Sequence, residues 1–270
     1  MVLWPRMNLF EFHDQSWCPA VLRQAITDCV TTAWSFTGLW RNTVPHLIEL
    51  LAAAEAPHIV DLCSGSGGPL PLALAPLQAR FPGLRVTFTD LYPKPEAVRA
   101  LVDAGAGRIR YHAAPVDAMA VPAELRGVRT IFGAFHHFPP EAAIRLLRGA
   151  SAAGQPIAVF EFQRRDFLRN MVWPTGLVGL SPVVALVQAP RRWWRAPLTL
   201  VPVIPALWAW DSVVTILRTY TPQELAEMAA AAAVPGYRWE VRDAEASGRR
   251  RITCLLGFPD PRGGVEVVRY

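Results

Sequence analysis

Short apolar runs alternate with amphipathic stretches over most of this chain. Strand-like runs rich in β-branched or aromatic residues occur at residues 58–62, 85–89, 109–112, 130–135 and 156–162. Between them, apolar positions recur every three or four residues, which predicts helices at 70–77, 95–103 and 141–148. The fifth run, PIAVFEF, is apolar almost throughout, as expected for a strand buried on both faces. The alternation predicts an α/β fold with a doubly wound, mostly parallel sheet.

The pattern changes at both ends of this alternating region. Residues 14–54 have helical spacing and predict an N-terminal helical cap. Near the other end, Thr221, Pro222 and Glu224 occupy the N-cap, N1 and N3 positions of a further helix. Two strands, 237–241 and 252–258, then follow across a polar, glycine-containing turn. They predict an antiparallel hairpin at the edge of the sheet.

We therefore divide the chain into three parts by pattern. They are a helical cap at 1–55, an α/β domain formed by 56–162 and 219–270, and an apolar insertion at 163–218. The insertion holds an uncharged stretch at 171–190, the cluster RRWWR at 191–195, and a second apolar stretch at 196–210. Prolines interrupt both apolar stretches, and a spanning hairpin would carry the arginines across the bilayer.

Three interpretations of the insertion follow. In the first, segment 171–217 lies at an anionic membrane surface as an interfacial or re-entrant hairpin, with Trp193 and Trp194 at headgroup level and arginines on lipid phosphates. In the second, it is a buried cap packed on the N-terminal helices. The third is a genuine spanning hairpin, since residues 171–190 are nominally long enough to cross the bilayer core.

Composition narrows the classes of partner. Hydrophobic residues make up 52% of the 270 positions and charged residues only 18%, with ten tryptophans and a net charge of +5. The only basic run interleaved with aromatic residues is 191–195, so nucleic acid is not expected as a partner. The four cysteines have no CxxC spacing, so neither a metal site nor a disulfide framework is expected. With no secretory signal in residues 1–14, we expect a cytoplasmic protein, peripheral or re-entrant at the inner face of the membrane.

The most informative segment is the turn after the first strand. The strand runs into DLCSGSGG at 61–68, and a helix follows, so backbone N–H groups of the turn can approach a ligand closely. The second strand ends on Asp90, where a carboxylate can accept hydrogen bonds from ribose hydroxyls. A glycine-rich strand end can also be a simple tight turn, but the pairing with Asp90 favours a nucleotide-type cofactor site.

The turn, the strand order and the closing antiparallel pair resemble the class I S-adenosylmethionine-dependent methyltransferases, with a Rossmann-like sheet. The resemblance covers roughly residues 56–162 and 219–258, and it implies S-adenosyl-L-methionine as cofactor. It departs from the family at Cys63, where the turn usually carries its first glycine. The cofactor contacts that it implies are Asp61, Cys63, Gly65, Ser66, Gly67, Asp90, Leu91, Asp117 (near the adenine) and Phe135.

Candidate catalytic groups follow the fourth and fifth strands. The segment FHHF at 135–138 matches the part of the family that faces the reactive methyl group, so His136 or His137 is a candidate general base. Glu161, at the end of the fifth strand, can orient a histidine or the substrate. The alternatives are histidines that only shape the pocket and a Glu161 that forms a surface salt bridge. Asp211 and Arg218, two helical turns apart, are expected to pair with each other or to serve the pocket.

These features predict a methyltransferase (EC 2.1.1 class) for an apolar or membrane-associated small molecule, held between the tryptophan-rich N-terminal helices and the insertion. One alternative is a non-catalytic, membrane-bound binding protein that keeps the fold, which Cys63 favours. Another is a nicotinamide-dependent oxidoreductase, although that class normally lacks the antiparallel final pair. The methyl acceptor and the oligomeric state are left open by the sequence.

Overall fold

The computed structural model describes residues 5–54, 57–165, 193–244, 252–260 and 264–268. The chain divides into two compact units, and each is built from two separate segments. The first unit comprises Met1–Gly38 and Gln163–Tyr220, and the second comprises Leu39–Phe162 and Thr221–Tyr270. The two units are described in turn.

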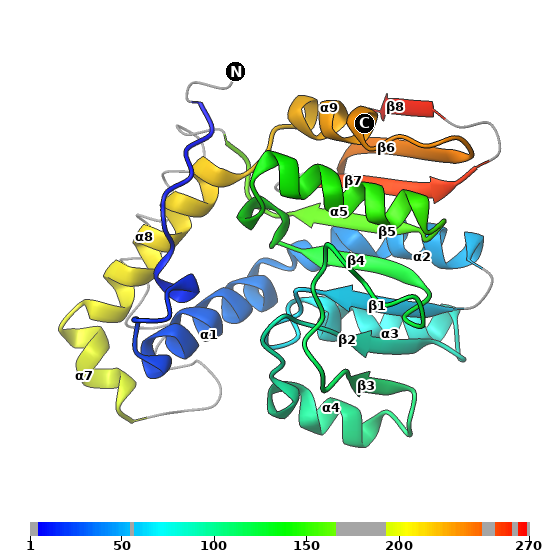
Figure 1. Ribbon diagram of the computed structural model, residues 1–270. Helices are drawn as coiled ribbons and strands as arrows, with labels where there is room; N and C mark the ends of the chain where they lie inside the picture. Colours follow the sequence, from blue (N-terminus) through cyan, green and yellow to red (C-terminus); the bar gives the residue numbers. More distant parts are fainter. Residues whose placement is uncertain (1–4, 55–56, 166–192, 245–251, 261–263, 269–270) are drawn as a thin grey trace. The chain divides into compact units, whose positions relative to one another are not determined.

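The second unit is built on an eight-stranded sheet of order β3-β2-β1-β4-β5-β7-β6-β8 (Figure 1). Its strands are β1 His58–Leu62, β2 Arg85–Phe88, β3 Ile109–Tyr111, β4 Val128–Phe132, β5 Ile157–Glu161, β6 Tyr237–Ala244, β7 Ile252–Pro259 and β8 Gly264–Val268. Strands β1 to β5 pair in parallel, whereas β7 is antiparallel to both β5 and β6. The predicted α/β fold and the closing hairpin are confirmed.

One strand was not predicted from the sequence. β8 pairs in parallel with β6 and forms this edge of the sheet. The sequence had predicted that the hairpin of β6 and β7 would form it. Strand β4 is also displaced from its prediction at 130–135. It begins at Val128 and ends at Phe132, because Gly133 adopts a left-handed conformation with φ of 57°. The next residues form a short 3-10 helix, η4 (Phe135–His137), instead of extending the strand.

Helices cover both faces of this sheet. The helices are α2 Val44–Ala53, α3 Leu70–Arg80, α4 Arg99–Ala104, α5 Pro140–Ala152 and α9 Pro222–Ala231, with 3-10 turns η2 Leu39–Thr43 and η3 Pro95–Val98. Helices α5 and α9 lie side by side on one face, and α2 and α3 lie on the other (Figure 1). The predicted start of α9 is confirmed as a capping box, in which Thr221 and Glu224 each accept a hydrogen bond from the other's backbone N–H. The helix expected at 95–103 divides into η3 and α4.

The first unit is helical. It contains η1 Phe12–Asp14, α1 Ala20–Thr37, α7 Arg195–Leu200 and α8 Val203–Arg218. Apolar faces of α1 and α8 pack on each other through the buried residues Ala25, Ile26, Cys29, Ile204 and Trp208. The described part of the insertion therefore packs on α1, as the buried-cap interpretation expects for this part.

Two charged residues of α8 hold the N-terminal segment in the same unit. Asp211 accepts hydrogen bonds from the backbone N–H groups of Phe12 (2.7 Å) and His13 (3.1 Å). Arg218 forms an ion pair with Asp14 at 3.2 Å. Asp211 and Arg218 thus bind η1, where the sequence suggested that they pair with each other or serve a pocket.

The insertion's first apolar stretch, residues 171–190, lies outside the described residues, as do Arg191 and Arg192. Over the part of the chain that the structure describes, no helix combines the length and the apolar character needed to cross a membrane. Arg195 was expected to reach lipid phosphates, but it is buried and ion-paired with Asp28. Burial against α1 removes this arginine from any membrane-facing role.

Candidate cofactor and catalytic site

The turn after β1 bends the chain sharply through left-handed residues. Cys63, Gly65 and Gly67 have φ angles of 55°, 51° and 100°. A Cβ on Gly67 would stand 2.7 Å from Cγ1 of Val98, whereas a Cβ on Gly65 would meet nothing within 4 Å. Gly67 is therefore required by packing. Gly65 leaves open space beside the backbone, where a ligand can approach.

Asp61 fastens this turn to the neighbouring strand. Its side chain is 1% exposed, and its two oxygens accept hydrogen bonds from the hydroxyls of Thr130 on β4 and Ser64 in the turn, both at 2.6 Å. Burial raises the pKa of Asp61 to about 7, although both hydrogen bonds act in the opposite direction. These contacts show Asp61 holding the shape of the turn; its predicted contact with the cofactor's methionine end stays a prediction.

Asp90 lies beside the turn, as its position after β2 predicted. Its Oδ2 accepts a hydrogen bond from the N–H of Gly65 at 2.7 Å, and its Oδ1 accepts one from the N–H of Tyr92 at 2.8 Å. The Tyr111 hydroxyl, at the end of β3, donates to the carbonyl of Gly65 at 2.9 Å. Each carboxylate oxygen keeps a second lone pair, so Asp90 can still accept hydrogen bonds from a diol.

The remaining predicted cofactor residues occupy different environments. Leu91 is exposed, Asp117 is half-buried, and Phe135 is fully buried. The Asp117 carboxylate accepts a hydrogen bond from the N–H of Met119 at 2.8 Å, which orders the loop after β3. The hydroxyl oxygen of Ser66 is buried and has no hydrogen-bond partner within the described residues, so it is available to a ligand.

A buried imidazole and carboxylate connect η4 to the end of β5. Glu161 accepts hydrogen bonds from both the backbone N–H and Nδ1 of His136, each at 3.0 Å. Both side chains are almost fully buried. The alternative of a surface salt bridge for Glu161 is therefore wrong, and the prediction that it orients a histidine agrees with the geometry.

His137 lies next to this pair and is more accessible. It is half-buried, and its ring centroid lies 4.3 Å from that of His136. The three side chains come from the carboxyl ends of β4 and β5, the same edge of the sheet as the turn after β1. Ligands bind outside this edge in open α/β sheets.

Sequence reasoning missed two groups in this arrangement. Thr130 supplies the hydroxyl that holds Asp61, and Tyr111 supplies the hydroxyl that holds Gly65. Both had been interpreted only as strand residues. Their roles depend on pairing between strands that are distant along the chain, and no local pattern signals them.

The turn and its surroundings fit a nucleoside cofactor. The open space at Gly65 allows a ligand to approach the backbone closely. Ser66 offers a hydroxyl oxygen, and the carboxylate of Asp90 can accept hydrogen bonds from a ribose. The Cys63 thiol adds no charge at neutral pH, because burial raises its pKa. Cys63 takes the left-handed conformation normally given to glycine, so the turn keeps its course with a side chain at that position.

No protein-family model matches the chain, and no curated protein sequence matches it. Among solved structures, the plantazolicin methyltransferase BamL, in complex with a triazolic desmethylPZN analog and SAH, matches with a TM-score of 0.50 at 9% identity, over 89% of this chain and 98% of that one. An O-methyltransferase family protein from Burkholderia thailandensis gives 0.44 at 19% identity, covering 82% and 56%. Human N-acetylserotonin methyltransferase in complex with SAM gives 0.49 at 16% identity, covering 94% and 64%.

The strand order and the match to BamL define the class of fold. The sheet is the Rossmann-like sheet of the class I S-adenosylmethionine-dependent methyltransferases, as the sequence predicted. The chain spans 56% of the Burkholderia protein and 64% of the human enzyme.

Proposed function

We propose that the protein is an S-adenosylmethionine-dependent methyltransferase that acts on a small molecule. The observation that carries this proposal is the turn at 61–68, whose open Gly65 is hydrogen-bonded to Asp90 at the carboxyl edge of a methyltransferase-type sheet. Asp90 would bind the ribose, Gly65 and Ser66 would line the cofactor, and Asp61 would keep the turn in shape. The BamL structure contains SAH and shares this fold, which supports the assignment.

When bound, S-adenosylmethionine supplies a methyl group on a sulfonium, which is already activated for displacement. The protein therefore contributes alignment, and a base where the acceptor must lose a proton. We assign the base to His137, because it is more accessible than His136. Glu161 accepts a hydrogen bond at Nδ1 of His136 and fixes that ring, so His136 and Glu161 are positioning residues for η4.

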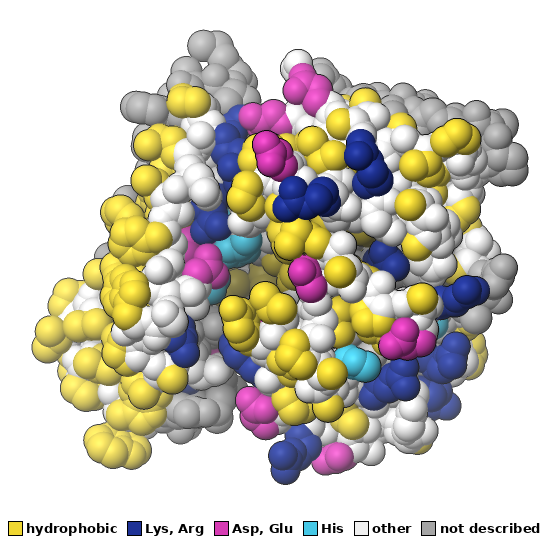
Figure 2. All heavy atoms as spheres, viewed as in Figure 1, with side chains coloured by type: hydrophobic (Ala, Val, Ile, Leu, Met, Phe, Trp, Pro, Cys, Tyr) yellow, Lys and Arg dark blue, Asp and Glu magenta, His cyan; other side chains and the backbone are white. Residues whose placement is uncertain are grey.

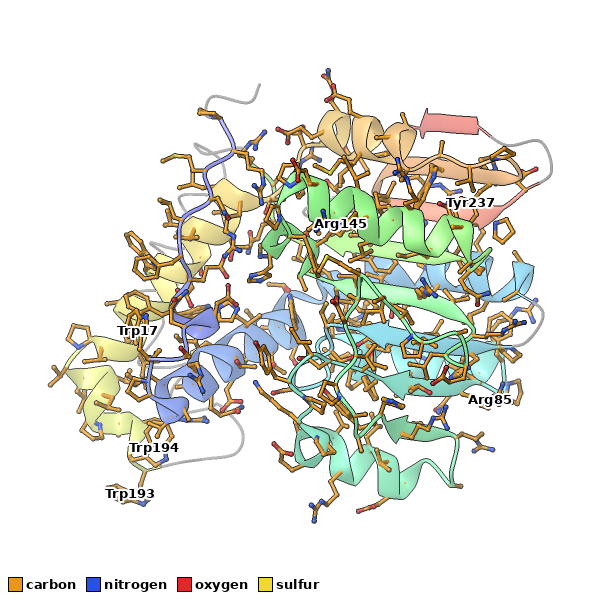
Figure 3. The ribbon with its side chains drawn as sticks, viewed as in Figure 1. Trp17, Arg85, Arg145, Trp193, Trp194 and Tyr237 are labelled. Atoms are coloured by element: carbon orange, nitrogen blue, oxygen red, sulfur yellow. The ribbon has the colours of Figure 1, made fainter. Side chains whose placement is uncertain are left out.

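For the substrate, we propose an apolar molecule that reaches the protein from a membrane surface. Most of the exposed large apolar side chains belong to the first unit, and the surface over α7 and α8 is rich in them (Figure 2). Trp193 is 86% exposed and Leu200 79%, and Trp193 extends away from α7 (Figure 3). Exposed aromatic and aliphatic side chains of this kind favour contact with lipid headgroups and acyl chains.

The cofactor assignment is tested by calorimetric titration of the purified protein with S-adenosylhomocysteine. We expect micromolar binding, and competition by nicotinamide dinucleotide should be absent. No binding with or without detergent would contradict the methyltransferase assignment, whereas binding of the dinucleotide would favour the oxidoreductase alternative.

Turnover and membrane contact are tested separately. Transfer of labelled methyl from S-adenosylmethionine to lipophilic acceptors would distinguish the enzyme from a binding protein that keeps only the fold. For the membrane, we expect co-sedimentation with anionic vesicles that falls in Trp193→Ser, with Tyr92→Ser on the exposed surface of the sheet unit as control. Equal binding of both variants and the original protein would exclude the role of Trp193.

A further inference from the structure

A buried arginine lies on β4, in the middle of the sheet, and the proposed reaction does not use it. Arg129 is the second residue of β4, and its backbone N–H donates to the carbonyl of Pro156 at 2.8 Å. The residue is only 5% exposed. Its Nε is buried, and it has no hydrogen-bond partner among the residues that the structure describes. A buried cation without a counter-charge is strongly unfavourable, so an anion beside it would be stabilising.

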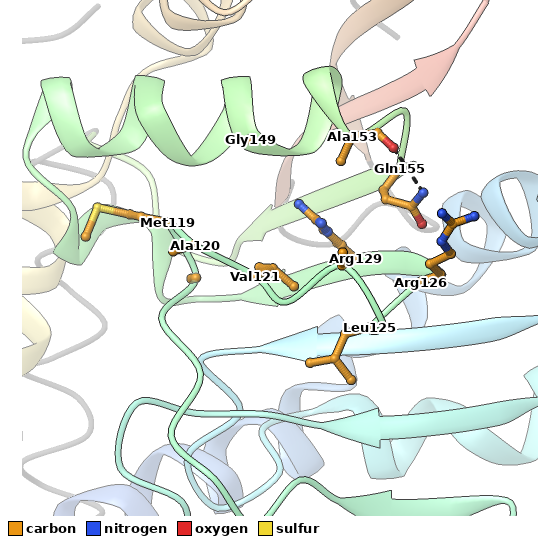
Figure 4. Close-up of a pocket in the computed structure, with 11 residues that line it drawn as sticks. Met119, Ala120, Val121, Leu125, Arg126, Arg129, Gly149, Ala153 and Gln155 are labelled. Atoms are coloured by element: carbon orange, nitrogen blue, oxygen red, sulfur yellow. Dashed lines mark hydrogen bonds between the residues drawn. The ribbon is translucent and has the colours of Figure 1, made fainter.

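Arg129 lines a pocket of about 370 Å³ between β4, helix α5 and the loop at 118–125 (Figure 4). In the close-up, its side chain extends from β4 toward α5, between Val121 and Ala153. Burial lowers the pKa of Arg129, but a guanidinium remains charged over the pH range in which proteins fold. The pocket therefore contains a fixed positive charge beside side chains that are mostly of apolar type.

The rest of the lining shows which ligand the charge would attract. Among the described residues, no acidic side chain lines the pocket, and a second arginine, Arg126, is exposed at its margin. The side-chain amide of Gln155 is already engaged, accepting from Gly127 N–H and donating to the Ala153 carbonyl. Most of the other lining residues are apolar, among them Val121 and Leu125.

We propose that this pocket binds a small organic carboxylate. The carboxylate would pair with the guanidinium of Arg129, which can donate two parallel N–H bonds, and the apolar body would lie against Val121 and Leu125. The volume suits a small organic molecule better than an inorganic ion, because small-molecule sites are typically about 300–1,000 Å³. This site is separate from the turn at 61–68 and from His136, His137 and Glu161.

Thermal unfolding of the full chain in benzoate tests the proposal, with inorganic phosphate at matched ionic strength as the second arm. A ligand that binds only the folded state raises the Tm with increasing concentration. We expect benzoate to raise the Tm and phosphate to leave it unchanged. Arg129→Met should abolish the benzoate response, and Arg126→Ala should weaken it several-fold. Arg85→Met, an exposed arginine on β2, is the control that should respond like the original protein.

A second variant blocks the pocket and leaves Arg129 intact. A Cβ on Gly149 would meet only the carbonyl oxygen of Met119, at 3.8 Å. The Cβ of a leucine therefore fits at this position, and the rest of its side chain would extend along the pocket wall. Gly149→Leu should lose the benzoate response, and it decides the question if Arg129→Met does not fold. The proposal is overturned by no response in the original protein, by a response retained in Gly149→Leu, or by a response to phosphate alone.

Discussion

The carboxylate of Glu161 holds His136 by two hydrogen bonds, one from the backbone N–H and one at Nδ1, each at 3.0 Å. A single buried side chain thus fixes both the ring and the backbone of the 3-10 turn after β4. Because His137 is the next residue in this turn, its position depends on the same contact. Glu161 therefore connects the end of β5 to the proposed base.

Glu161→Gln should lower turnover about 10- to 100-fold and leave cofactor affinity nearly unchanged. Glutamine retains one acceptor but loses the charge that favours a proton on His136 Nδ1. The measurement is kcat at saturating cofactor, with titration of S-adenosylhomocysteine for affinity. Glu141→Gln, on the exposed side of α5, is the matched control. Loss of cofactor binding in Glu161→Gln would instead assign this residue to the cofactor site.

Asp90→Ala should weaken cofactor binding by roughly 1–3 kcal/mol, because the ribose hydroxyls and the N–H of Gly65 both lose an acceptor. Asp103→Ala, an exposed acid on α4, should bind as the original protein does. Calorimetric titration of both variants checks this expectation. Equal affinity in Asp90→Ala would remove this residue from the ribose site.

His137→Ala should lower turnover while leaving cofactor affinity intact, since the proposed role is proton removal from the acceptor. The pH dependence of kcat distinguishes a base from a residue that only shapes the pocket. For a base, the rate of the original protein should rise with pH as the acting group loses its proton, and the variant should lose that rise. An unchanged pH profile in the variant would exclude His137 as the base.

Asp61 should make the protein less stable as the pH rises from about 4 to 7. Its pKa is raised to about 7 by burial, so over this range the folded protein holds a proton that the unfolded chain releases. The free energy of unfolding then falls by at most about 1.4 kcal/mol per pH unit from this group. His46, whose pKa burial lowers to about 4, has the opposite effect.

Comparison of the original protein with Asp61→Asn isolates the contribution of Asp61 to the pH dependence of stability. Urea unfolding at several pH values should show the variant gaining stability relative to the original protein as the pH rises to 7, with no further gain above it. A constant difference between the two proteins would show that Asp61 is ionised throughout.

Gly67→Ala should destabilise the protein by about 1–3 kcal/mol, because its Cβ would overlap Val98 and the backbone is left-handed. Gly65→Ala, with open space at its Cβ, should cost less stability and mainly reduce cofactor affinity. Adding Val98→Ala should recover part of the loss in Gly67→Ala but none of the affinity loss in Gly65→Ala. Chemical unfolding and titration measure the two quantities separately.

Local signals in the sequence were sufficient for the parallel strands, the turn at 61–68, the placement of Asp90 and the capping box of Thr221 and Glu224. Each depends on period, spacing or turn chemistry within a few residues. The hydrogen bond from Thr130 to Asp61 and the ion pair between Arg195 and Asp28 join residues far apart in the chain. Such contacts follow from the tertiary arrangement, so the expected lipid contact of Arg195 was wrong.

The end of β4 shows a second limit of prediction from the sequence. The run from Thr130 to Phe135 is apolar enough for a strand, and its composition alone gives no reason to end it early. Gly133 ends it through a backbone conformation that the residue permits but does not require. That small difference decides whether Phe135 and the two histidines lie on an extended strand or on the turn that Glu161 fixes.

The helical unit is assembled from two segments that are synthesised far apart in time. Helix α1 is complete at Thr37, but α8, on which it packs, ends only at Arg218. At typical translation rates of about 5–20 residues per second, α1 would wait roughly 10–40 s for its partner. During that interval its apolar face, including Ile26 and Cys29, has no α8 to cover it. A chaperone that binds exposed helices would therefore have its longest opportunity on this segment of the nascent chain.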